Sequence, residues 1–334
     1  MNKMPERLKL ANLPTKIEKL ERFSDKLGGP AIYIKRDDQT GTEFSGNKIR
    51  KLEFSVKEAL DQGCNLLITC GGIQSNHCRC TAAVAARTGM KSCLVLRGDQ
   101  ATRPDGNLFI DKLLGAELYF VTPEQYKNEI SGIMEQIKKL QEAKGYKPYI
   151  IPEGASNGIG MFGYYTAMEE IVAQQKEMGM DFDIVAIAVG SGGTYAGLAL
   201  AAKVLNCRAR VCGINVCDTA AFFKDKVEKV IKQGLPYTDM TVEVSQDDFL
   251  IIDGYVGKGY ALSTPEELAF IHEFAELEGI ILDPVYTGKA MYGLAGEIKK
   301  GRFNGVKNIL FIHTGGLFGL FPQKESFEFK SVFL

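Results

Sequence analysis

The feature that most constrains the fold is a repeated alternation of apolar segments, glycine-rich turns and amphipathic segments. Residues 65–70, 92–97, 182–189 and 308–313 are mostly apolar, and each run has the length of one strand. Apolar runs that alternate with helical patterns are typical of parallel sheets covered by helices on both faces. The sequence therefore predicts an α/β fold.

The length of the chain indicates more than one domain. Its 334 residues exceed the size at which a single core stops growing, roughly 250–300 residues. We expect two domains, each a largely parallel twisted sheet flanked by helices. Residues 1–50 and 164–334 would form a large cofactor-binding domain, and 51–163 a small domain that closes over the active site. The boundaries come from size, because no proline-rich linker marks a hinge.

The remaining elements follow from turn residues and periodicity. We expect further strands at 31–36, 117–121, 147–152 and 208–216. We expect helices at 16–27, 48–62, 77–87, 108–114, 123–143, 160–178, 191–205, 220–233 and 265–278, and a last helix that ends at Lys300.

Composition excludes several classes of function. Forty basic and forty-one acidic residues give a formal net charge of -1, which argues against nucleic acid or an anionic membrane as partner. Eight cysteines without a Cys-x-x-Cys pair, and only three histidines, argue against a metal site and for reduced thiols in the cytoplasm. Residues 1–20 intersperse charges among apolar residues, unlike a signal peptide, and no apolar run reaches membrane-spanning length.

Lys48 is the first candidate for chemistry. Asn47 can cap a helix, which would place Lys48 in its first turn, where the helix dipole disfavours a cation. Such a lysine is more readily a neutral amine, the form needed for covalent chemistry with carbonyl compounds. The alternative is that Lys48, Arg50 and Lys51 form a basic run on a solvent-exposed helix face.

Gly190–Thr194 is a candidate phosphate site. This run of small residues leads from a buried strand into a helix, so its backbone N–H groups can converge on an anion. It lacks the Gly-Lys-Ser/Thr of a Walker A loop, and Tyr195 breaks the dinucleotide fingerprint. Gly158–Gly163 has the fingerprint spacing, but no acidic residue ends the next strand. Close packing at a helix start explains that segment better.

Gln74–His77 forms a second helix start, with free N–H groups suited to a carboxylate. The alternative there is a plain N-cap by Ser75 or Asn76. A reactive lysine, a phosphate loop and a carboxylate site on an α/β scaffold are together what pyridoxal phosphate would use.

The chain resembles the D-cysteine desulfhydrase and 1-aminocyclopropane-1-carboxylate deaminase family, within the tryptophan-synthase-β-like, fold type II pyridoxal phosphate enzymes. The resemblance extends from about Pro14 to Phe321. Its motifs are Phe-Ser-Gly-Asn-Lys-Ile-Arg-Lys-Leu-Glu at 44–53, Gly-Gly-Ile-Gln-Ser-Asn-His at 71–77, Gly-Ser-Gly-Gly-Thr at 190–194, Leu-Asp-Pro-Val-Tyr-Thr-Gly-Lys-Ala-Met at 282–291 and His-Thr-Gly-Gly at 313–316.

The resemblance implies roles for matching residues. Lys48 would carry the cofactor covalently and then take the α-proton of the substrate. Asn76 would bind the phenolic oxygen of the cofactor and contribute to the substrate site. Ser75 would hold the substrate carboxylate and relay a proton. The phosphate would be held by Ser191, Gly192, Gly193 and Thr194.

Further residues are implied around the substrate and the pyridine ring. Tyr286 and Tyr260 would reach the substrate as catalytic residues, and His77 would contribute to substrate binding. Packing is the alternative for all three. Thr287 and Thr314 would face the cofactor ring. The family also suggests a homodimer acting on a small amino acid.

Thr287 and Thr314 favour the desulfhydrase branch. In the deaminase branch a glutamate follows the matching tyrosine and can keep the pyridine nitrogen protonated, whereas a neutral residue suffices when a thiolate leaves. We therefore predict D-cysteine desulfhydration to pyruvate, hydrogen sulfide and ammonia. Two departures from the family pattern, Ser45 and Leu317–Gly319, leave 1-aminocyclopropane-1-carboxylate or another β-substituted alanine, such as cysteate, as alternative substrates.

Functions of two other classes are alternatives. A nicotinamide-dependent dehydrogenase would explain the α/β pattern and Asp218 after a strand, but leaves Lys48 and the 71–77 turn without a purpose. A non-catalytic protein that keeps the cofactor pocket could lose the lysine, which is present here. Both explain fewer of the motifs than the lyase does.

Overall fold

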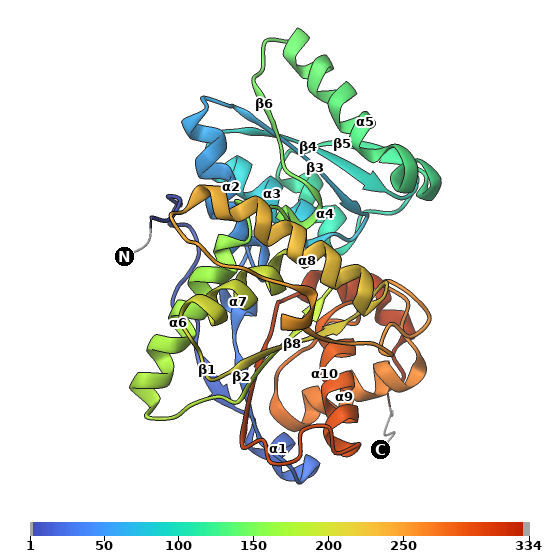
Figure 1. Cartoon of the computed structure of the whole chain (residues 1–334). Helices are drawn as coiled ribbons and strands as arrows, with labels where there is room; N and C mark the ends of the chain where they lie inside the picture. Colours follow the sequence, from blue (N-terminus) through green and yellow to red (C-terminus); the bar gives the residue numbers. More distant parts are fainter. Residues whose placement is uncertain (1–2, 330–334) are drawn as a thin grey trace.

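The computed structural model describes residues 3–329 and contains two sheets, each flanked by helices (Figure 1). The large sheet has the order β1-β2-β10-β7-β8-β9 and the small sheet the order β5-β4-β3-β6. All pairings are parallel except that of β1 with β2. The predicted α/β class with two largely parallel sheets is confirmed.

The elements have the following bounds. The strands are β1 (Ile17–Lys19), β2 (Ala31–Lys35), β3 (Leu66–Gly72), β4 (Lys91–Arg97), β5 (Glu117–Val121), β6 (Pro148–Ile150), β7 (Ile184–Val189), β8 (Arg210–Asn215), β9 (Leu250–Ile252) and β10 (Asn308–Ile312). The helices are α1 (Glu21–Leu27), α2 (Lys48–Asp61), α3 (Asn76–Arg87), α4 (Gly106–Leu113), α5 (Pro123–Ala143), α6 (Phe162–Met178), α7 (Gly193–Val204), α8 (Ala220–Gly234), α9 (Pro265–Glu278) and α10 (Thr287–Lys299).

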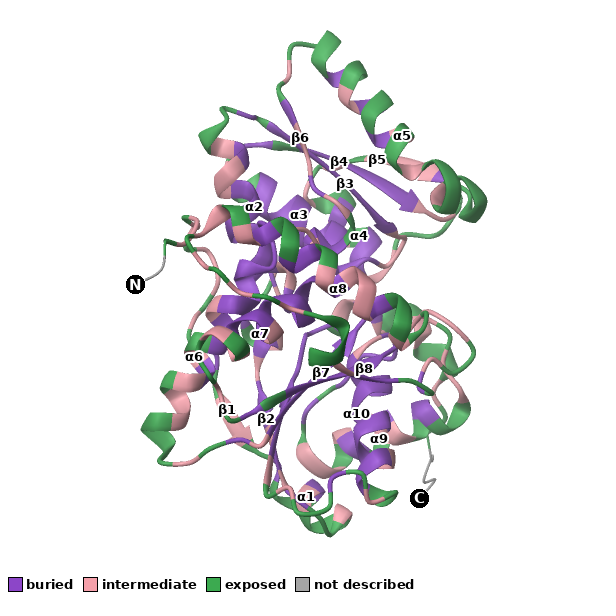
Figure 2. Ribbon diagram, viewed as in Figure 1, coloured by how far each residue is buried: buried purple, intermediate pink, exposed green. Residues whose placement is uncertain are grey.

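The large sheet is buried on both faces. Along β7, Val185 and Ile187 join a core cluster with α6, α7 and α8, whereas Ile184 and Ala186 join a second cluster with α9 and α10. The central strands β3, β4, β7 and β8 are buried along nearly their whole length (Figure 2). Two buried faces explain why these strands read as continuous apolar runs rather than as alternating patterns.

The small sheet is covered by α5 on one face and by α2, α3 and α4 on the other (Figure 1). The helix α2 also packs against α6, because Phe54 of α2 and Phe162 of α6 share one core cluster. Gly163 permits this contact: a Cβ there would lie 2.4 Å from the backbone of Arg50. The close-packing interpretation of the 158–163 glycines is therefore confirmed. The domain boundaries at 50/51 and 163/164 remain a proposal.

The structure differs from the expectation at two elements. The helix expected over 16–27 begins only at Glu21, and residues 17–19 form an edge strand whose partner is β2. The short strand β9 was not expected at all. In both cases three residues gain order from pairing with a distant strand, which a local pattern does not reveal.

The glycine-rich turns are positioned by the strands that precede them. The loop after β7, the loop after β10 and the turn after β3 lie at such ends, where ligands of open α/β sheets bind. None of the helices within residues 3–329 combines the length and apolar character needed to cross a bilayer.

Candidate active site

One cavity is lined by residues from five segments that are distant in sequence. The predicted site residues that line it are Lys48, Asn76, Ser191, Gly192, Thr194, Tyr286 and Thr314. They come from the start of α2, the start of α3, the turn after β7, the N-cap of α10 and the loop after β10. The fold therefore brings most of the predicted site together.

Lys48 is the first residue of α2 and is partly buried. Burial lowers the pKa of its amine from 10.5 to about 8, so the neutral form is accessible near physiological pH. Its neighbours Arg50 and Lys51 are fully buried. The alternative of a basic, solvent-exposed helix face is therefore wrong.

Asn47 precedes α2 but does not cap it. Its backbone is helical and its side chain makes no capping hydrogen bond. Instead, Lys48 Nζ donates to Asn47 Oδ1 at 2.8 Å, and Asn47 Nδ2 donates to Thr194 Oγ1 at 3.0 Å. The expectation of a side-chain cap was wrong, because these two partners occupy the amide. Asn47 links the Lys48 amine to the start of α7.

The approach of the loop after β10 fixes the position of this segment. Gly46 has a φ of 111°, and a Cβ there would lie 2.6 Å from the carbonyl oxygen of Thr314. Asn47 N donates to that same carbonyl at 3.2 Å. Ser45, which departs from the family pattern, donates its hydroxyl to Asp38 O at 2.8 Å and does not line the cavity.

A group of hydroxyls and a buried lysine lies behind the turn after β7. Ser156 Oγ is 2.8 Å from Ser191 Oγ and accepts from Gly193 N at 3.3 Å. Lys51 Nζ donates to the same Ser156 Oγ at 3.3 Å. This is its one hydrogen bond within residues 3–329, and no carboxylate there lies within ion-pair distance of it. Burial and the charge of Lys48 hold the pKa of Lys51 well below its usual range.

Ser75 and Asn76 begin α3. Ser75 is the N-cap and its Oγ accepts from Cys78 N at 3.2 Å, as the alternative interpretation of this turn predicted. Its hydroxyl hydrogen remains available to donate. Asn107 Nδ2 donates to Asn76 Oδ1 at 3.1 Å, which orients the Asn76 amide. Because Oδ1 is bound, the Asn76 NH₂ group is the part free to donate to a ligand.

Tyr286 and Tyr260 are in contact through their hydroxyl groups, and their ring centroids are 5.9 Å apart. Lys48 Nζ lies 5.7 Å from the centroid of the Tyr286 ring. Burial raises the pKa of Tyr260 to about 12, and burial and the Tyr260 hydroxyl hold that of Tyr286 well above its usual range. Both phenols therefore stay protonated at neutral pH and can donate hydrogen bonds.

Five of the predicted residues are not part of the cavity lining: Ser75, Gly193, Tyr260, His77 and Thr287. His77 is buried, and its Nε2 lies 2.8 Å from Thr69 Oγ1, a hydroxyl that donates to a backbone carbonyl. Thr287 is also buried, and its hydroxyl donates to Asp283 Oδ1 at 2.7 Å. Neither side chain lines the cavity with Lys48. Their roles in substrate and cofactor binding remain predictions.

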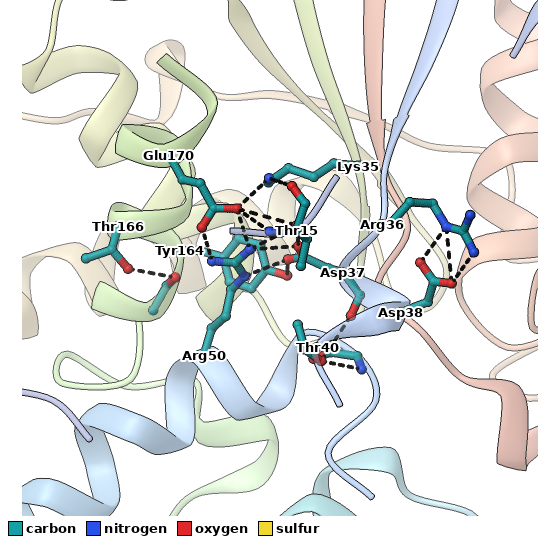
Figure 3. Close-up of polar contacts among 12 residues, drawn as sticks. Thr15, Lys35, Arg36, Asp37, Asp38, Thr40, Arg50, Tyr164, Thr166 and Glu170 are labelled. Carbon is teal, nitrogen blue, oxygen red and sulfur yellow. Dashed lines mark hydrogen bonds and ion pairs between the residues drawn. The ribbon is translucent and has the colours of Figure 1, made fainter. Parts of the chain in front are cut away.

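A buried cluster of charges anchors the first turns of α2 (Figure 3). Arg50 donates to Asp37 at 2.8 and 2.9 Å and to Glu170 at 2.9 and 3.1 Å, and Lys35 donates to Glu170 at 2.6 Å. Tyr164 also donates to Asp37, at 2.5 Å. Although burial alone would raise it, the Arg50 charge holds the pKa of Asp37 below its usual range. The helix that carries Lys48 is thus joined to β2 and α6.

Comparison with known proteins identifies the family. The family model described as pyridoxal-phosphate dependent enzyme matches residues 8–315. The chain belongs to the pyridoxal-phosphate dependent enzyme family. It is 42% identical over 326 residues to the Arabidopsis thaliana protein named bifunctional D-cysteine desulfhydrase/1-aminocyclopropane-1-carboxylate deaminase, mitochondrial, with 95% of this chain and 79% of that protein covered.

Two further similarities support the same family. The chain is 41% identical over 318 residues to the D-cysteine desulfhydrase of Klebsiella pneumoniae strain 342, covering 94% of this chain and 95% of that one. The crystal structure of an ACC deaminase homologue has a TM-score of 0.87 and 38% identity, covering 97% of this chain and 95% of that chain. The resemblance inferred from the motifs is confirmed.

The residues that line this cavity and lie behind it suit pyridoxal phosphate, the cofactor of this family. The buried Lys51 amine lacks an anionic partner within residues 3–329, which suits a nearby phosphate. A Cβ at Gly193 would lie 2.7 Å from the Cα of Ser156, and one at Gly190 would lie 2.9 Å from the Tyr286 ring. Only glycine therefore keeps the turn after β7 open at both points. The start of α7 presents backbone N–H groups of the kind that can bind a phosphate.

Three residues that the structure places at or beside this site were not predicted from the sequence to belong to it. Lys51 follows Lys48 by three residues on α2, so helical spacing could have indicated that both lie on one face. Asn47 was interpreted only as a cap. Asn107 on α4 carries no sequence signal, because its contact with Asn76 joins residues 31 positions apart.

Proposed function

We propose that this chain catalyses the β-elimination of D-cysteine to pyruvate, hydrogen sulfide and ammonia. The observation that carries the proposal is that no carboxylate is among the cavity-lining residues between 3 and 329. The nearby Asp283 is held by the amides of residues 285–287 and by the Thr287 hydroxyl. Thr314, which carries no charge, lines the cavity instead. Neutral surroundings suit a good leaving group such as a thiolate.

The residues of the chain have separable tasks in this reaction. Pyridoxal phosphate, when bound, supplies the electron-withdrawing group that makes the α-proton of an amino acid acidic. Lys48 would hold the cofactor and, as a neutral amine, would accept the α-proton. The start of α3, with the Ser75 hydroxyl, binds the substrate carboxylate. Tyr286, kept protonated, can donate a hydrogen bond to the sulfur as the Cβ–S bond breaks.

The names of the relatives support a lyase of this kind without selecting one substrate. The Klebsiella protein is named for D-cysteine, and the Arabidopsis protein for both D-cysteine and 1-aminocyclopropane-1-carboxylate. We favour D-cysteine because the deaminase branch would need an acidic residue where Thr287 lies. A homodimer in the cytoplasm, acting on a small amino acid, is part of the same proposal.

The test begins with the visible absorption spectrum of the purified protein. We expect a yellow holoenzyme that releases pyruvate and sulfide from D-cysteine but not from L-cysteine or 1-aminocyclopropane-1-carboxylate. Release of pyruvate from a different substrate alone would overturn the choice of D-cysteine. A colourless protein that takes up no pyridoxal phosphate but binds a nicotinamide cofactor would overturn the whole proposal.

Lys48 is tested by substitution. Lys48→Ala is expected to abolish elimination, because no other lysine is among the cavity-lining residues between 3 and 329, while the far-UV circular dichroism spectrum stays unchanged. Lys57→Ala, in the same helix but paired with Asp61 at 2.6 Å, is the matched control and should retain activity. More than trace activity in Lys48→Ala would show that the role of Lys48 is misassigned.

A further inference from the structure

Lys289 of α10 is a fully buried lysine outside the cavity that Lys48 lines. Its ammonium nitrogen donates to three backbone carbonyls, Val256 O at 2.6 Å, Gly259 O at 2.8 Å and Leu262 O at 2.8 Å. An ammonium group has three N–H donors, and each of them has a carbonyl here. All three carbonyls belong to one segment of the chain between α9 and β9.

This segment, residues 256–262, has few other backbone hydrogen bonds. Within residues 3–329 its backbone forms two more, from Gly259 N to Val256 O at 3.3 Å and from Leu262 N to Gly259 O at 3.2 Å. Both of these lie inside the segment. The Lys289 ammonium is therefore the group that joins the backbone of 256–262 to another element of the fold.

The backbone of the segment has a conformation that needs support. Ala261 has a φ of 60°, in the left-handed region that residues with a Cβ rarely adopt. Such a backbone persists only where its surroundings hold it. One anchor is Tyr255, which packs so closely on α10 that a Cβ at Gly293 would lie 2.8 Å from its ring. The other anchor is Lys289, one helical turn before Gly293 on the same helix.

The segment carries Tyr260 to the candidate active site. The Tyr260 hydroxyl contacts the hydroxyl of Tyr286, and Tyr286 lines the cavity with Lys48. Tyr286 is also the N-cap of α10, and Lys289 lies in the first turn of that helix. The start of α10 therefore positions both phenols, Tyr286 through its own backbone and Tyr260 through the hydrogen bonds of Lys289.

From these contacts we propose that Lys289 is a positioning residue for the reaction: its ammonium group fixes the backbone of residues 256–262 and so keeps the Tyr260 hydroxyl against Tyr286. Lys289 acts here as a tethered monovalent cation, because backbone carbonyls that converge on one point also bind free monovalent cations. The Glu267 carboxylate, 4.0 Å from Lys289 Nζ, balances its charge. The inference rests on the proposed function for the reaction that Tyr260 serves, but not for the contacts of Lys289.

The first measurement does not depend on activity. Hydrogen exchange of the purified full-length protein is followed by mass spectrometry in the wild type, Lys289→Met, Lys289→Gln and the control Lys299→Met. Methionine has nearly the length of lysine but no charge, and glutamine keeps a shorter donor. Lys299 is an exposed lysine at the end of the same helix.

We expect the amides of residues 256–262 to exchange roughly tenfold faster in Lys289→Met, because the hydrogen bonds from a charged donor are lost. Exchange in α9 and β7 should change by less than about twofold. Lys289→Gln should lie between Lys289→Met and the wild type, and it carries the test if Lys289→Met does not fold. Lys299→Met should exchange like the wild type.

The second measurement is pyruvate release from D-cysteine by the holoenzyme. Lys289→Met should lower kcat/KM by roughly tenfold to a hundredfold, and Lys299→Met by less than about twofold. Tyr260→Phe and the double variant Lys289→Met/Tyr260→Phe complete a cycle. If Lys289 acts through the Tyr260 hydroxyl, the double variant should lose no more than about threefold beyond the larger single loss. A purely structural role of Lys289 would make the two losses multiply.

Several outcomes would overturn the inference. Unchanged exchange of residues 256–262 in a folded Lys289 variant would show that the ammonium does not hold the segment. Faster exchange throughout α9 and β7 would indicate general destabilisation, and multiplicative losses in the cycle would separate Lys289 from Tyr260. A wild type that releases no pyruvate from D-cysteine overturns the proposed function instead. Faster exchange confined to residues 256–262 in Lys289→Met would then still support the anchoring of the segment.

Discussion

The lowered pKa of Lys48 makes a quantitative prediction about its reactivity. A lysine with the ordinary pKa of about 10.5 is neutral in only about 0.03% of molecules at pH 7. With a pKa of about 8, roughly one Lys48 amine in ten is neutral at that pH. The fraction available for attack on a carbonyl group is therefore about 300-fold larger at Lys48 than at an exposed lysine.

The assay is competitive labelling of the cofactor-free protein with acetic anhydride. Acetylation of each lysine is quantified by mass spectrometry between pH 6 and pH 10.5. Because only the neutral amine reacts, the labelling of Lys48 should rise with pH and level off above a midpoint of about 8. The exposed lysines serve as internal references and should still gain reactivity beyond pH 9. The midpoint, unlike the absolute rate, does not depend on how easily the reagent reaches the amine.

A substitution separates burial from hydrogen bonding. Asn47→Leu removes the oxygen that accepts from Lys48 Nζ at 2.8 Å and favours the charged amine. The midpoint of Lys48 labelling in Asn47→Leu should therefore lie at a lower pH than in the wild type. A wild-type midpoint near 10, or an upward shift in Asn47→Leu, would refute the argument that burial at this position keeps the amine neutral.

Two further predictions concern the surroundings of Lys48. Arg50→Gln leaves the buried Asp37 with a reduced set of partners and should lower the free energy of unfolding by about 3–5 kcal/mol, measured by urea denaturation. Arg208→Gln is the control: the ion pairs of Arg208 are exposed, so their loss should lower the free energy of unfolding by less than about 1 kcal/mol. Similar losses of stability in both variants would contradict the role of the cluster. Lys51→Met should raise the Kd for pyridoxal phosphate by roughly tenfold to a hundredfold, measured from the absorbance of bound cofactor at equilibrium. An unchanged Kd would show that Lys51 does not meet the phosphate.

Much of the fold and the centre of the site could be predicted because their signals are local. Continuous apolar strands, glycine-rich turns and the position of Lys48 at a helix start each depend on residues close together in sequence. The carboxyl-end rule for parallel sheets then brings the turns together without knowledge of the tertiary contacts. The edge strand β1 was not predicted, because its order comes from pairing with β2 and not from the pattern of its own three residues.

The parts of the site that could not be predicted depend on contacts between distant segments. Nothing near Asn107 in the sequence indicates that its side chain donates to Asn76 Oδ1. A basic run such as 48–51 is usually solvated. Here Arg50 and Lys51 are buried, because Arg50 forms ion pairs with Asp37 and Glu170 and Lys51 donates a hydrogen bond to Ser156. Partner choice of this kind is a property of the folded chain.

The buried charges around Arg50 also constrain how this chain can diverge. Arg50 and Lys35 balance Asp37 and Glu170, and each of the four charged groups has a partner of opposite sign within 2.9 Å. Substituting one member leaves an unpaired charge in the core, whereas exchanging a matched pair for apolar residues of similar volume can leave the free energy of unfolding nearly unchanged. Viable descendants should therefore change these positions in pairs, and a relative that differs at Arg50 should also differ at Asp37 or Glu170.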